Sequence, residues 1–81
     1  MEIQTGSIVY SKAGRDKGKI LLVVSVEGEY AYVADGDLRR VDKLKKKKLK
    51  HLQKTNKVSG ISENITNSEI RKILAEYKPN N

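Results

Sequence analysis

The chain has 81 residues and a formal net charge of +7, with 17 lysine and arginine residues against 10 aspartate and glutamate residues. A chain of this length forms one small domain with a thin core, which excludes a large substrate cavity. It contains no cysteine, which excludes disulfides and thiolate metal sites, and its excess of positive charge predicts an anionic partner, of which nucleic acid is the commonest.

Residues 1–5 turn polar at once, so the N-terminal region shows no apolar run of secretory or membrane-spanning length. The lack of cysteine fits a reducing compartment. We therefore expect a cytoplasmic protein without membrane contact.

Three apolar runs bounded by Gly, Asp or Ser predict three adjacent strands, over residues 8–10, 20–26 and 30–33. Six of the seven residues in the second run are apolar, which favours a strand that curves inside a barrel. Strict alternation places four of its side chains on one face: Ile20, Leu22, Val24 and Val26.

The third predicted strand has two tyrosines on one face and two smaller apolar residues on the other. Tyr30 and Tyr32 alternate with Ala31 and Val33, so only one pair can face the core. Outward-facing tyrosines could stack on unpaired bases. Alternatively, their rings pack over the end of the barrel.

A basic loop joins the first two predicted strands, and Asp16 is its only anion. Its cations are Lys12, Arg15, Lys17 and Lys19. Gly14 and Gly18 frame its tip, either because glycine tolerates the positive φ of turns or because unhindered N–H groups suit phosphate oxygens. We predict that the loop contacts nucleic-acid phosphates.

A second basic segment covers residues 39–57, which hold ten of the seventeen cations and one carboxylate, Asp42. An Asp35–Gly36–Asp37 turn precedes it and lacks the spaced oxygens of a calcium loop. We expect residues 38–41 to form a short fourth strand, the lysines at 45–48 an exposed mobile loop that phosphates order, and residues 49–52 a closing strand. The predicted RNA contacts of this segment are Arg39, Arg40, Lys45, Lys46, Lys47, Lys48, Lys50 and His51.

The sequence offers no catalytic or metal-binding constellation. His51 is the only histidine and has no Ser, Cys or second His at a recognisable spacing, so RNA stacking or phosphate contact is the sharper prediction for it. Paired carboxylates, a nucleophile with its base and a P-loop are also missing. We therefore expect no enzymatic activity, no cofactor and no metal.

Residues 57–65 lose the strand pattern and are predicted to be a linker. Residues 66–69 then fit a capping box, and an apolar stripe follows at helical spacing over residues 70–77, which predicts an amphipathic helix over residues 66–78 that Pro79 ends. A helix this short is marginal alone, so we expect it to dock on the barrel, on another protein or on a second copy.

The run from Gly6 to Val26, with Gly14 and then Lys17–Gly18–Lys19 between two apolar strands, resembles the KOW motif of ribosomal and transcription-associated proteins. Three blocks in the same order, residues 11–18, 34–41 and 45–52, are similar to the L-fourteen-e family, the KOW-type large-subunit proteins of archaeal and eukaryotic ribosomes. The similarity covers roughly residues 5–55, and the short chain looks like the bacterial KOW-domain RNA-binding proteins.

The resemblance implies a mainly β fold, a small SH3-like β-barrel over residues 1–56 followed by the linker and helix. It also implies binding of RNA, with large-subunit rRNA or a ribosome assembly intermediate as the expected partner and ribosomal or translation-factor proteins as further contacts. We therefore predict a ribosomal or ribosome-associated protein of translation that binds structured RNA. The alternative is a protein-interaction barrel attached to a transcription or translation factor.

Overall fold

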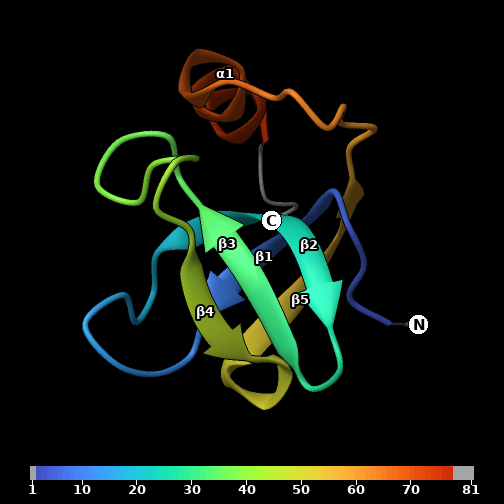
Figure 1. Cartoon of the computed structure of the whole chain (residues 1–81). Coiled ribbons are helices and arrows are strands. Elements are labelled where there is room, and N and C mark those ends of the chain that lie inside the picture. Colours follow the sequence, from blue (N-terminus) through green and yellow to red (C-terminus); the bar gives the residue numbers. More distant parts are fainter. Residues whose placement is uncertain (1, 78–81) are drawn as a thin grey trace.

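The computed structural model describes residues 2–77 as a five-stranded antiparallel sheet with one C-terminal helix (Figure 1). The elements are β1 (Ser7–Ser11), β2 (Ile20–Glu27), β3 (Tyr30–Ala34), β4 (Lys45–Lys48), the 3₁₀ helix η1 (Leu49–His51), β5 (Leu52–Val58) and α1 (Asn67–Glu76). The strand order is β4-β3-β2-β1-β5. The predicted mainly β fold with a short C-terminal helix is confirmed at this level. No helix within residues 2–77 is long and apolar enough to cross a membrane.

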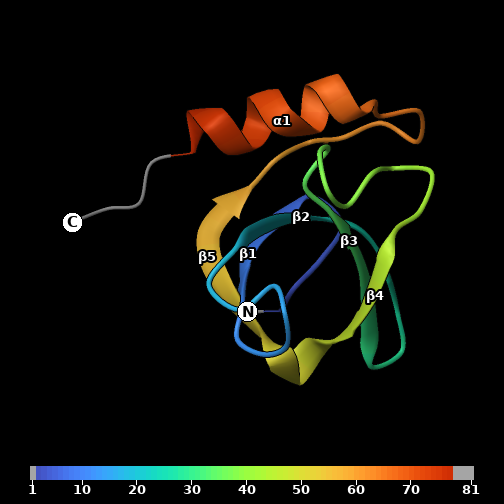
Figure 2. The same ribbon diagram turned by 90° about the vertical axis from the view of Figure 1, so that its left-hand side faces the viewer.

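The sheet curves strongly. Its two edge strands, β4 and β5, follow each other in the chain and are separated only by the three residues of η1. Three residues span about 10 Å at most, so the two edges come close at this end (Figure 2). The curvature places one face of the sheet inside and leaves the other face to be covered by α1 and by solvent.

Two apolar clusters pack on opposite faces of the central strands. Val9, Leu21 and Val23 belong to the inner cluster with Ala31, Val33 and Leu52. Ile8 and Leu22 belong to a second cluster with Ala34, Ile65 and Ile70, under α1. Both faces of β2 are therefore buried at Leu21 and Leu22, which accounts for the nearly continuous apolar sequence of this strand. Full burial of one such side chain stabilises the fold by about 1.5–3 kcal/mol.

A β-bulge in β2 changes which face its last residues occupy. Val23 pairs with Val33 and Ser25 pairs with Tyr32, so Val24 is an extra residue on this strand. As a result Val26 packs against the inner cluster, whereas Val24 packs against the cluster under α1. The prediction that Val24 and Val26 share a face with Ile20 and Leu22 was wrong for Val26, because strict alternation does not hold across a bulge.

The segment between β3 and β4 is a turn and not the strand predicted over residues 38–41. Asp35 Oδ1 accepts hydrogen bonds from the backbone N–H groups of Asp37 and Arg39, both at 2.8 Å. The N–H groups of Asp35 and Gly36 in turn donate to the Arg39 carbonyl. The Asp35–Gly36–Asp37 turn is confirmed, and its carboxylate uses the N–H groups that a strand would need for pairing.

The four consecutive lysines form β4 and not the predicted mobile loop. Their backbone pairs with β3 over a register that runs from Tyr30↔Lys48 to Val33↔Lys45. The free edge of β3 satisfies the backbone groups, and alternation turns successive lysines to opposite faces, which reduces their mutual repulsion. Residues 49–51 form η1, so the predicted closing strand begins only at Leu52.

The predicted capping box at the start of α1 is confirmed. Thr66 Oγ1 accepts from the Glu69 N–H at 3.1 Å, and Glu69 Oε1 accepts from the Thr66 N–H at 2.9 Å. Ile70 is fully buried, and the rest of the apolar stripe packs on the same cluster, so the helix docks on its own sheet. The predicted stop at Pro79 lies outside the described residues.

The predicted linker is partly structured. β5 extends through Val58, so strand pairing covers the first two linker residues. Residues 59–66 form neither helix nor strand, yet Ile61 and Ile65 pack in the cluster under α1. Two apolar anchors thus hold this connection against the domain.

Candidate nucleic-acid interface

The loop between β1 and β2 has a defined backbone conformation. The Gly18 N–H donates to the Ser11 carbonyl and the Lys19 N–H to the Asp16 carbonyl, both at 2.8 Å. Gly14 and Gly18 have φ values of +77° and +87°, in the region that side chains disfavour. A Cβ at Gly18 would meet no atom within 4 Å, so this glycine serves the backbone conformation and not a close contact.

Asp16, the single carboxylate of this loop, points inward and is only 4% exposed. Arg39 Nη2 lies 3.3 Å and Lys47 Nζ 4.0 Å from its Oδ2. Lys47 Nζ also donates to Ser11 Oγ at 2.6 Å and to the Ala13 carbonyl at 2.9 Å. The inward network, defined as Asp16, Arg39, Lys47 and Ser11, therefore ties the loop to β4 and to the turn after β3.

This network divides the predicted RNA-binding residues into two groups. Lys47 has a side chain that is 8% exposed and Arg39 one that is 31% exposed, and both are committed to Asp16. The other predicted cations of the loop and of β4–η1 are exposed, apart from the half-buried Lys19. The exposed predicted residues are Lys12, Arg15, Lys17, Arg40, Lys45, Lys46, Lys48, Lys50 and His51.

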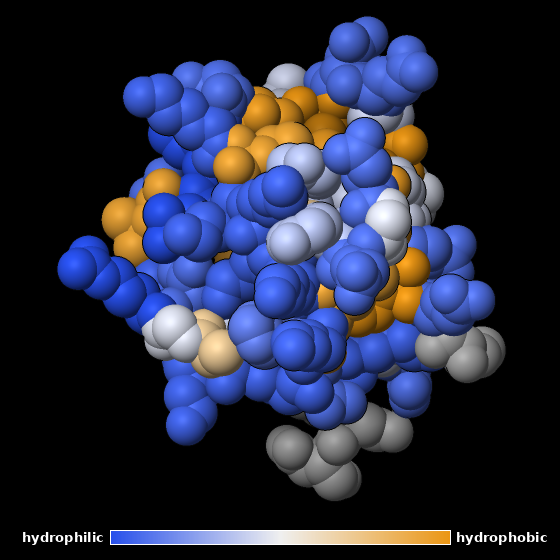
Figure 3. All heavy atoms as spheres, turned by 60° about the horizontal axis from the view of Figure 1, so that its bottom comes forward, coloured by the Kyte–Doolittle hydropathy of each residue, from blue (hydrophilic) through white to orange (hydrophobic). Residues whose placement is uncertain are grey.

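The two basic segments predicted from the sequence lie side by side. The Lys12 N–H donates to the His51 carbonyl at 2.8 Å, which joins the loop to η1, and Lys47 joins it to β4. In Figure 1 the loop lies beside β4, and Figure 3 shows that hydrophilic side chains cover most of the face containing η1 and the β2–β3 turn. Apart from Arg40, which lies 4.0 Å from Asp42, the exposed cations form no ion pair within residues 2–77.

Sequence reasoning missed the inward network. Asp16 was recognised only as the anion of the loop, and Ser11 was assigned no role. A lone carboxylate among four cations was the available signal, because such a group is readily buried when cations neutralise it. Its partners could not be found from spacing, since Arg39 and Lys47 are more than twenty residues away along the chain.

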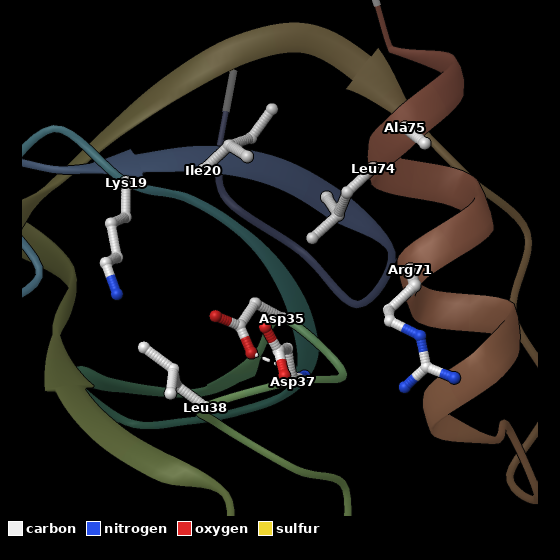
Figure 4. A pocket seen from close by; sticks show the side chains of 8 residues that line it. All are labelled: Lys19, Ile20, Asp35, Asp37, Leu38, Arg71, Leu74 and Ala75. Carbon is white, nitrogen blue, oxygen red and sulfur yellow. Dashed lines mark hydrogen bonds between the residues drawn. The ribbon is translucent and has the colours of Figure 1, made fainter.

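A second concave region lies between β2, the turn after β3 and α1 (Figure 4). Leu74 projects from α1 on the side of Ile20, and Asp35 and Asp37 lie beside Leu38 on the opposite wall. Leu38 is 70% exposed, which is unusual for a large apolar side chain. This region mixes apolar side chains with both signs of charge, unlike the uniformly basic loop and β4.

Within residues 2–77, no group of three or more His, Cys, Asp or Glu side chains is placed to hold a metal ion. No family model matches the chain. No curated protein matches it either.

Proposed function

We propose that this chain is an RNA-binding domain of the KOW type, whose curved sheet is a small SH3-like β-barrel. It contacts phosphates of structured RNA through the β1–β2 loop and the β4–η1 segment. The partner is large-subunit rRNA or a ribosome assembly intermediate, and the protein acts in the cytoplasm as a ribosomal or ribosome-associated factor. No catalysis is part of this proposal.

The observation that carries the proposal is the inward position of Asp16. Because Arg39 and Lys47 neutralise this carboxylate inside the loop, Lys12, Arg15 and Lys17 face solvent without a local anion. A loop of fixed conformation that presents only cations suits phosphate oxygens better than a flexible tail, since less ordering entropy is lost on binding. Such contacts position a backbone and read its shape more than its base sequence.

The experiment is sedimentation of the tagged chain from a cell lysate on sucrose gradients at low and high salt, with sequencing of the bound RNA. We expect recovery with the large ribosomal subunit or its precursors at low salt, and release at high salt. If duplex-DNA behaviour carries over, about six to ten phosphate contacts weaken binding about 10³–10⁵-fold between about 50 and 200 mM salt. An RNA-free profile at low salt would contradict the proposal.

A protein-interaction domain attached to a transcription or translation factor is the second candidate. The exposed Leu38 beside the concave region favours it, because a protein partner could bury this side chain. Charge reversal at Lys17 and Lys46 separates the two functions. It abolishes recovery of an RNA partner and leaves a protein partner bound through Leu38 in place.

A further inference from the structure

The outward face of β2, β3 and β4 carries two rows of side chains across the sheet. In each row a tyrosine of β3 lies between a β2 residue and a lysine of β4. The rows are Glu27–Tyr30–Lys48 and Ser25–Tyr32–Lys46. Ala31 and Val33, which alternate with the tyrosines, are fully buried in the inner cluster. The two rows therefore point away from the core.

Both tyrosine rings are half-buried and are held by weak contacts. The Lys46 ammonium lies 4.2 Å from the centroid of the Tyr30 ring, and the Tyr32 hydroxyl donates to Glu27 Oε1 at 3.5 Å in an exposed setting. The bulge at Val24 places the small, exposed Ser25 opposite Tyr32. Exposed contacts of this kind are easily exchanged for those of a ligand.

The charges beside the rings follow one direction. Lys46 and Lys48 are exposed on the β4 side, and the exposed Lys50 follows in η1. The ion pairs among residues 2–77 do not include these three lysines. Glu27 lies on the opposite side and offers a hydrogen-bond acceptor. Across the face, a ligand meets an acceptor, then an aromatic ring, then an ammonium group.

We propose that these six residues, here called the tyrosine face, bind unpaired nucleotides of single-stranded RNA. Bases stack on Tyr30 and Tyr32, phosphates contact Lys46 and Lys48, and base N–H groups donate to Glu27. On binding, the Lys46 ammonium moves from the Tyr30 ring to a phosphate. This inference rests on the proposed RNA-binding function and specifies its substrate: RNA with a loop, bulge or free end next to the phosphates held by the basic loop. Bases inside a duplex cannot reach a flat ring, so a duplex does not use this face.

The test compares a short oligouridylate with an RNA duplex of the same length, using the full chain. The protein has four tyrosines and no tryptophan, so tyrosine fluorescence reports stacking directly. We expect oligouridylate, and not duplex, to quench this fluorescence. The Tyr30→Leu/Tyr32→Leu variant should bind oligouridylate about 5- to 150-fold more weakly for each base lost and bind duplex unchanged. The matched Tyr30→Phe/Tyr32→Phe variant keeps the rings and should retain full affinity.

Three outcomes would overturn the inference. The first is an absence of fluorescence quenching by saturating oligouridylate in the unaltered chain, a result that needs no variant to fold. The second is equal affinity of the Leu and Phe variants for oligouridylate. In both cases salt-sensitive duplex binding would leave the proposed function standing. The third is a failure of the unaltered chain to bind either RNA, which would overturn both proposals together.

Discussion

Replacement of Lys47 by methionine tests whether the inward network stabilises the domain. The variant Lys47→Met keeps an unbranched side chain but removes the ammonium that bonds Ser11 Oγ and the Ala13 carbonyl and lies 4.0 Å from Asp16. A hydrogen bond to a charged group contributes about 1.5–3 kcal/mol. Two are lost here, while burial of methionine removes the desolvation cost of the lysine. We expect the free energy of unfolding to fall by about 2–4 kcal/mol.

The matched control is Lys46→Met, in the same strand and with the same chemical change. Lys46 is exposed and contacts only the Tyr30 ring among the interactions described, so its loss should cost at most about 1 kcal/mol. Urea titration followed by circular dichroism measures both variants. For a domain of this size, about 1 kcal/mol corresponds to about 4–8 °C in Tm, so the two variants should melt at least about 4 °C apart. Equal stability of the two variants would show that the Lys47 contacts do not hold the loop.

Three further predictions concern charge, packing and capping. Arg15→Glu/Lys17→Glu should weaken RNA binding and flatten its salt dependence, measured by filter binding across salt concentrations, with little change in Tm because both side chains are exposed; an unchanged slope would contradict phosphate contact by the loop. Ile70→Ala should lower the free energy of unfolding in urea by about 2–5 kcal/mol, because Ile70 is fully buried under the helix, and a loss below about 1 kcal/mol would contradict the docking of α1. Thr66→Ala should cost about 1 kcal/mol in the same assay through loss of the helix cap, whereas Ser68→Ala, one turn position away and exposed, should cost much less.

Local chemistry made parts of the fold predictable. The capping box at Thr66 and Glu69 and the turn at Asp35 depend on side chains that bond neighbouring backbone groups, so short sequence windows contain the whole signal. The apolar runs of β1, β2 and β3 were also visible, because β-branched residues and flanking glycines mark strands without reference to partners. The helix stripe was readable for the same reason.

Features decided by distant partners could not be read in this way. The lysines of β4 are strand-forming only because β3 offers them a free edge, and composition alone predicted a mobile loop. The bulge at Val24 depends on how β2 fits β3, and it moves Val26 to the other face. In the candidate site, the sequence identified the basic segments, whereas the separation of Lys47 and Arg39 from the exposed cations required the position of Asp16 in space.

The place of β1 in the sheet has a consequence for how the chain is made. β1 pairs with β2 on one side and with β5 on the other, and the Thr55 hydroxyl closes this second contact on the Ile8 carbonyl at 2.6 Å. As the chain leaves the ribosome, β1 to β4 can pair in order, but one edge of β1 stays open until β5 has emerged. During that interval an apolar strand edge carrying Ile8 and Val9 is free to pair with another nascent chain. Arrival of β5 is thus the step at which self-association and folding compete, and chaperones that shield strand edges would act most usefully before it.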